Sequence, residues 1–119
     1  MWRYDQSSGK MSREGKVFTG YAGHGRGKNN PSLQSAVGIG PIPSGLWSIT
    51  GVKASANTGP FTILLEPKPG TQTFGRSAFR IHGDSIGNPG TASHGCIILR
   101  RAEREAIWRS GDRDLEVVA

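Results

Sequence analysis

Glycine and proline interrupt this chain so often that they favour short strands and tight turns over long helices. They occupy 18 and 7 of the 119 positions, whereas glycine averages about seven per cent in ordinary proteins. A chain of this length can bury one modest core. We therefore expect a mainly β fold in which residues 1–119 form a single domain.

Short apolar segments bounded by turns predict the strands. Residues 2–6 carry aromatic side chains and end at a turn over 7–10. Residues 16–21 are predicted to be the partner strand. Further strands are predicted at 46–52, 61–65, 79–81, 96–99 and 115–118. Residues 22–38 are rich in glycine and asparagine without periodicity, which predicts a long loop.

One short helix is predicted near the C-terminus, over residues 101–110. Leu99, Ala102, Ala106 and Ile107 are spaced to form an apolar stripe along it. Glu105 and Arg109 form a favourable i,i+4 pair. Gly111 follows as a candidate C-terminal cap.

The charge distribution constrains partners and location. The net charge is +6, and the excess lies in residues 1–99, because arginines and acids balance from Arg100 onward. Scattered basic residues suit a solvated surface or a polyanion such as a cell wall better than nucleic acid. No apolar run approaches the roughly 20 residues of a membrane span. The N-terminus lacks a secretory layout, so we expect synthesis in the cytoplasm without a signal peptide.

The lone cysteine, Cys96, is the most informative functional residue. It lies in Ser93-His94-Gly95-Cys96, downstream of Ile81-His82-Gly83-Asp84. If Ile81-His82 runs beside Cys96-Ile97 in a sheet, the His82 imidazole can reach the thiol. We predict an imidazolium–thiolate pair, with Cys96 as nucleophile and His82 as base. His94 points to the same face, as a supporting or substrate-side group.

Neighbouring residues supply the other parts that acyl transfer needs. The carbonyl of Gly83, or else Asp84 or Ser85, is expected to fix the tautomer of His82. The N–H groups of Gly95 and Cys96 are candidate oxyanion donors, with Ser93 beside them. Gly95 is expected to let substrate approach the backbone closely.

Three other interpretations remain open at this point. A lone cysteine can be a small buried apolar residue. His82, Asp84 and His94 could instead hold the metal of a peptidase. The chain could also be a non-catalytic basic module that binds wall polymer. We predict the cysteine enzyme, with neither metal nor cofactor.

The histidine–cysteine motif resembles that of the L,D-transpeptidases, the YkuD-like cysteine enzymes of bacterial cell walls. The Pro-Gly turn over 40–49 looks like that family's entry into a core strand. A narrower resemblance, to small L,D-transpeptidase-like toxins delivered by type VI secretion, covers nearly the whole chain. It rests also on residues 2–9, 27–31, 74–77 and 110–115.

This resemblance implies a β-sandwich or barrel-like domain in which Cys96 attacks the diaminopimelate–D-alanine bond of peptidoglycan stem peptides. It implies His82 as the base, oriented by the Gly83 carbonyl. The product thioester would pass to water, a D-amino acid or another stem. It also implies export by secretion machinery, action in the periplasm of a target cell, and a cognate immunity protein.

The chain departs from the family pattern in two places. Only residues 83–92 separate His82 from Ser93, so the segment covering the substrate is short. The family often has an arginine two residues after the cysteine, where this chain has Ile98. Arg80, Arg100 or Arg101 is expected to bind the substrate carboxylate in its place.

Overall fold

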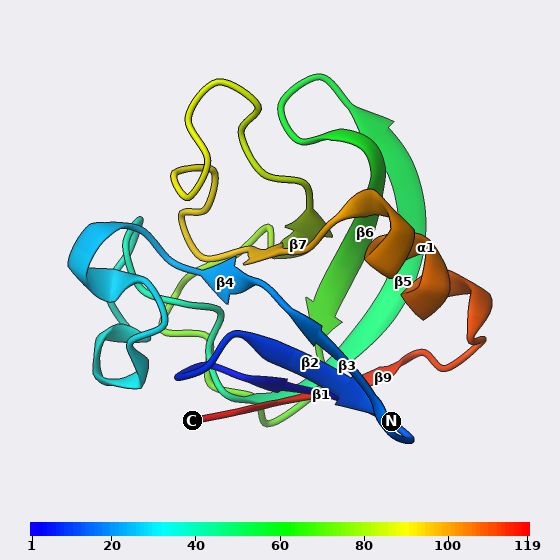
Figure 1. Ribbon diagram of the computed structural model, residues 1–119. Coiled ribbons are helices and arrows are strands. Elements are labelled where there is room, and N and C mark those ends of the chain that lie inside the picture. The colour runs from blue at the N-terminus through cyan, green and yellow to red at the C-terminus, as the bar shows by residue number, and fades with distance from the viewer.

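Nine strands form one sheet that nearly closes into a barrel, with one helix packed outside it (Figure 1). The computed structural model describes residues 1–119. The mainly β class with one short helix is therefore confirmed. The strands are β1 (Trp2–Asp5), β2 (Lys10–Arg13), β3 (Lys16–Thr19), β4 (Tyr21–Ala22), β5 (Gly45–Ser55), β6 (Gly59–Pro67), β7 (Arg80–His82), β8 (Ile97–Ile98) and β9 (Asp114–Val118). Their order across the sheet is β3-β2-β1-β9-β5-β6-β7-β8-β4.

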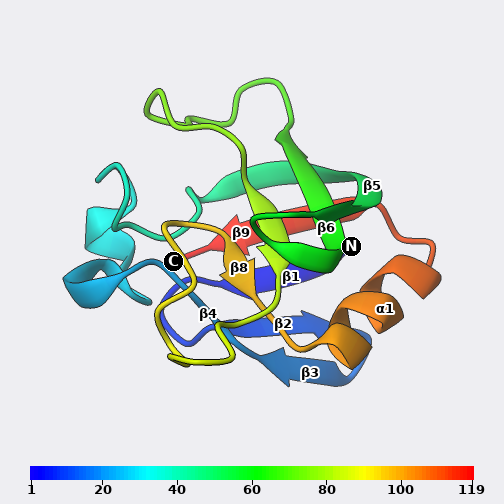
Figure 2. The ribbon, with the colours of Figure 1, turned by 90° about the horizontal axis from the view of Figure 1, so that it is seen from above.

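The sheet closes because β3 and β4, at its two ends, are consecutive in the chain. β3 pairs with β2, and after Gly20 the chain pairs with β8 as β4. Figure 2 shows these two strands in line along one side of the molecule. The strand predicted at 16–21 exists, but its predicted partner was wrong. β2 lies between it and β1, because the tight turn starting at Ser7 leads into a strand that begins at Lys10.

The inner face of this sheet holds a continuous apolar core. Alternating residues of β1 and β9 point inward, which follows the period-2 geometry of strands. The long antiparallel pair β5–β6 extends beyond its predicted bounds and bends at two register shifts. The largest fully buried apolar side chains are Trp2, Tyr4, Met11, Ile42, Trp47, Ile63, Ile81, Ile97, Ile107, Leu115 and Val117.

The segment predicted as a loop over 22–38 is held in place by buried polar side chains. It contains two single turns of 3-10 helix, η1 (Gly25–Gly27) and η2 (Pro31–Leu33). Gln6, wholly buried, donates to the carbonyl of Ile42 at 2.8 Å. Arg76 donates to the carbonyl of Gln34 within the segment at 2.5 Å, and to those of Gly40 and Pro41 just after it at 2.8 and 2.9 Å. These bonds join residues far apart in sequence, so no local pattern indicates them.

The helix α1 (Arg101–Arg109) lies over β6 and β7. Its start is fixed by Glu103, whose carboxylate accepts the backbone N–H of Arg100 at 3.0 Å. Gly111 follows with φ of +75°, as a C-terminal cap requires. The predicted apolar stripe is wrong in part: Ala102 is exposed, and the buried residues are Glu103, Arg104 and Ile107. No helix of the structure is long and apolar enough to cross a membrane.

Closure at Gly20 generates a stability prediction. A Cβ at this position would lie 1.8 Å from the carbonyl oxygen of Ile98, so Gly20→Ala must push β4 away from β8. We expect a loss of about 1–3 kcal/mol in the free energy of unfolding. Gly87→Ala is the matched control, because nothing lies within 4 Å of its Cβ position. Denaturant unfolding measures both, and equal stability of the two variants would contradict this account of closure.

Candidate active site

Two short parallel strands bring His82 and Cys96 to the same face of the sheet. Ile81 lies opposite Ile97 and His82 opposite Ile98, with Cys96 directly before β8. His82 and Cys96 are therefore diagonal neighbours on one face, a relation that places Cβ atoms about 7–8 Å apart. The predicted register was one residue out. With Ile81 opposite Cys96, the two side chains would have pointed to opposite faces.

Cys96 is open to solvent from two hollows. The larger is a cleft of about 860 Å³ that contains His82, His94 and Cys96 in its lining. The turn between β5 and β6, the loop after β7 and Arg104 of the helix contribute the rest of its walls. The turn and the loop rise above the sheet in Figure 1. A second hollow, of about 330 Å³, shares His94 and Cys96 and is otherwise lined by residues 37–38 and 75–79. The half-buried thiol is thus accessible to substrate.

His82 is held in the tautomer that a base requires. Its Nδ1 lies 2.9 Å from the carbonyl oxygen of Gly83. Because a carbonyl only accepts, Nδ1 carries the proton and Nε2 keeps a free lone pair. Burial of the ring lowers the pKa of His82. The hydrogen bond to Gly83 raises this pKa, and the charges of Arg104 and Arg80 lower it further. The imidazole is therefore neutral near pH 7.

The Cys96 thiol is also neutral at rest. Burial raises its pKa, and this effect exceeds the opposing influence of the Arg80 N–H and of the Arg80 and Arg76 charges. The thiol lies 3.7 Å from the carbonyl oxygen of Ala78. Together with the neutral His82, this argues against the imidazolium–thiolate pair expected from the sequence. The resting site is a thiol beside a neutral imidazole.

Ser93 organises the turn that presents Cys96. Its buried hydroxyl accepts the N–H groups of Gly23 and Gly95 at 2.8 and 3.0 Å and donates to the Cys96 carbonyl at 2.6 Å. The Gly95 N–H is therefore occupied and does not point at substrate, contrary to its predicted oxyanion role. Ser93 likewise has no hydrogen-bonding capacity left for a ligand.

Glycine is needed at position 95 because Arg76 packs against it, and not, as predicted, because substrate approaches the backbone there. Its φ is +143°, and a Cβ there would lie 2.5 Å from an Nη atom of Arg76. That same nitrogen donates to the carbonyl of His94 at 3.2 Å. Arg76 thus joins the cysteine turn to the 34–41 segment.

Asp84 and Ser85 line the cleft but mainly shape the loop after β7. The Asp84 carboxylate accepts the hydroxyl of Tyr21 at 2.6 Å and the N–H groups of Ser85 and Gly90. The Tyr21 hydroxyl in turn accepts the N–H of Ala92 at 3.0 Å. Neither Asp84 nor Ser85 contacts the His82 ring nitrogen, which the Gly83 carbonyl binds instead.

His94 is exposed and stands apart from the base. Its Nδ1 lies 3.1 Å from the Gly38 carbonyl oxygen, and its ring stacks on that of His24 with centroids 5.2 Å apart. His82, Asp84 and His94 each have different partners. The structure contains no group of three or more His, Cys, Asp or Glu side chains that could hold a metal ion.

The arginines are arranged differently from the expectation. Arg100 and Arg101 extend into solvent and pair with Glu103 and Glu105. Neither lines the cleft, and nor does the half-buried Arg80. Arg104 does line it, although sequence reasoning missed it. The available signal was its position three residues before Ile107, which places both on one helix face.

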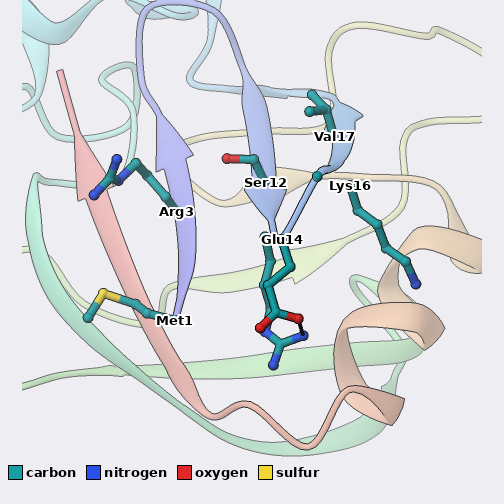
Figure 3. Close-up of a pocket in the computed structure, with 8 residues that line it drawn as sticks. Met1, Arg3, Ser12, Glu14, Lys16 and Val17 are labelled. Carbon is teal, nitrogen blue, oxygen red and sulfur yellow. Dashed lines mark hydrogen bonds and ion pairs between the residues drawn. The ribbon is translucent and has the colours of Figure 1, made fainter.

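Another hollow, of about 260 Å³, lies by the β1–β3 strands and contains none of the predicted site residues. Met1, Arg3, Ser12, Lys16 and Val17 surround it, and the Glu14 carboxylate pairs with Arg13 (Figure 3). Its charges are mixed, and its lining contains neither histidine nor cysteine.

The Ser93 network generates a second stability prediction. Ser93→Ala leaves two buried N–H donors and one carbonyl without their partner, so we expect a loss of about 2–4 kcal/mol in the free energy of unfolding. Ser35→Ala, at an exposed position, is the control and should change stability by less than about 0.5 kcal/mol. Thermal and denaturant unfolding measure both. A Ser93→Ala protein as stable as the control would show that this hydroxyl does not hold the turn.

Comparison with known proteins identifies a family for this chain. No curated protein and no solved structure matches the chain significantly. A family model for the Tlde1 domain, a type VI secretion effector domain, matches residues 16–118. The match includes all of the cleft and both motifs, and it supports the effector part of the resemblance seen in the sequence. The chain therefore belongs to the Tlde1 domain family of type VI secretion effectors.

Proposed function

We propose that this domain is a cysteine L,D-transpeptidase or L,D-carboxypeptidase that acts on peptidoglycan stem peptides. One observation carries the proposal: an accessible thiol and a histidine with a free Nε2 share one face of two paired strands and one cleft. A fixed Nδ1–H tautomer beside a lone cysteine is what cysteine acyl transfer requires. The cleft volume of about 860 Å³ is ample for a short peptide.

In this mechanism His82 acts as a general base during attack. As the Cys96 sulfur attacks the diaminopimelate carbonyl carbon, Nε2 of His82 takes the thiol proton. The tetrahedral intermediate collapses when the imidazolium gives that proton to the D-alanine nitrogen, which leaves as the amine. A thioester on Cys96 remains. The second hollow beside Cys96 supplies a separate approach for water, a D-amino acid or a stem amine.

The Cys96 N–H is the remaining backbone candidate for the oxyanion, because the Gly95 N–H is bound to Ser93. Membership of an effector family supports an antibacterial role for this chemistry. As the resemblance implied, the target would be the wall of a neighbouring cell, reached in its periplasm. A cognate immunity protein would then protect the producing cell by covering the cleft.

The nucleophile and base are tested together. Cys96→Ala should lower cleavage of tetrapeptide muropeptides by at least about 10³-fold. His82→Asn should lower it by about 10²- to 10⁴-fold. His94→Asn, an exposed histidine in the same cleft, should cost much less. Mass spectrometry of the products measures all three, with unfolding curves to establish that each variant folds. Turnover by Cys96→Ala equal to that of the wild type would refute the proposal.

The pH dependence tests the neutral base. Catalysis needs unprotonated His82, and its pKa lies below the ordinary value of 6.5. As pH falls, kcat/KM should therefore hold past pH 6.5 and decline only at lower pH. The pH profile of kcat/KM for His94→Asn should show the same acid limb as that of the wild type. An acid limb centred above pH 7 would show that His82 does not work as the neutral base.

A further inference from the structure

One buried cation in the cleft has no partner in the protein. Arg104 is 4% exposed, and its Nε and one Nη lie fully enclosed without a hydrogen-bond acceptor. The two glutamates nearest to it in sequence are occupied. Glu103 pairs with Arg100, and Glu105 pairs with Arg101 and Arg109. A buried charge without a partner is unfavourable for folding, so its retention points to a ligand.

The contrast with Arg76 strengthens this reading. Arg76 is equally removed from solvent, but its guanidinium donates to four backbone carbonyls and serves the fold. Arg104 has none of these bonds and lines the cleft together with Cys96 and His82. The other full charge in the lining, Asp84, is engaged by Tyr21 and backbone N–H groups. The free charge of the cleft is thus positive.

The guanidinium lies next to the base. Two of its nitrogens are 3.4 Å from the position that a Cβ on Gly83 would occupy, and the Gly83 carbonyl binds the His82 ring. A Cβ at Gly83 would be in van der Waals contact with the guanidinium, so Arg104 lies against the backbone of this residue. A group that accepts a proton from His82 Nε2 lies in the cleft that Arg104 also lines.

In the proposed reaction that group is the D-alanine nitrogen, and its α-carboxylate is one carbon away. We propose that Arg104 binds the terminal carboxylate of the leaving D-alanine, and thereby selects stems that end in a free carboxylate. The remaining Nη of Arg104, which is not among the enclosed atoms, can donate a charge-assisted hydrogen bond to a carboxylate oxygen. In exchange, the incoming D-amino acid would present its carboxylate to the same place. This inference rests on the proposed function.

The test compares two substrates and three enzymes. The substrates are a tetrapeptide muropeptide ending in D-alanine and the same compound ending in D-alanine amide. Wild type should prefer the free acid by about 10- to 100-fold in kcat/KM, the range expected for a charge-assisted hydrogen bond. Arg104→Gln should lose that factor on the acid while changing little on the amide. Arg109→Gln, an exposed arginine on the same helix, should behave as wild type.

The outcomes separate this inference from the proposed function. If wild type cleaves neither substrate, the proposed function fails. If wild type cleaves both equally, or if Arg104→Gln loses the same factor on both, then Arg104 does not read the carboxylate and the inference is overturned. Unfolding curves check that Arg104→Gln folds. If Arg104→Gln does not fold, the preference of wild type for the free acid over the amide decides the inference. Arg104→Lys, which keeps the charge without the planar guanidinium, then serves as the second variant.

Discussion

The parallel pairing of β7 with β8 is the contact on which the site depends. Only three and two residues form these strands, yet their register decides whether His82 and Cys96 share a face. A slip of one residue would turn His82 away from Cys96. Ile81 and Ile97, both fully buried, lie opposite each other and fix that register from the core side. The geometry of the candidate site is therefore a by-product of apolar packing.

Buried polar side chains complete what the short strands begin. Ser93 holds the turn before Cys96, and Arg76 joins this turn to the 34–41 segment. Tyr21 and Asp84 fold the loop that connects His82 with Ser93. Each of these residues uses its hydrogen bonds within the protein, whereas Arg104 does not. The distinction separates groups that build the cleft from the group left free to bind.

The sequence predicted the fold class and the helix, since these rest on local pattern. It also predicted that His82 and Cys96 would come together in one site, from the chemistry of the two residues. Turn residues and apolar runs indicated most strands, and the lone cysteine downstream of His82 and His94 indicated the candidate site. What it could not predict depends on contacts between distant segments. Three features depend on such contacts: the hydrogen bond from the Gly95 N–H to Ser93, the position of strand β2 between β1 and β3, and the buried face of α1. Arg104 was missed because an arginine between two glutamates on a helix ordinarily faces water.

The junction at Gly20 has a consequence for how the protein behaves among its own copies. Since the chain over 16–22 joins both ends of the sheet, its two edge strands, β3 and β4, are only four and two residues long. Sheet rims are the places where β proteins recruit one another into aggregates. Edge strands this short offer another copy of the chain few backbone groups to pair with, which disfavours edge-to-edge association when the protein is concentrated.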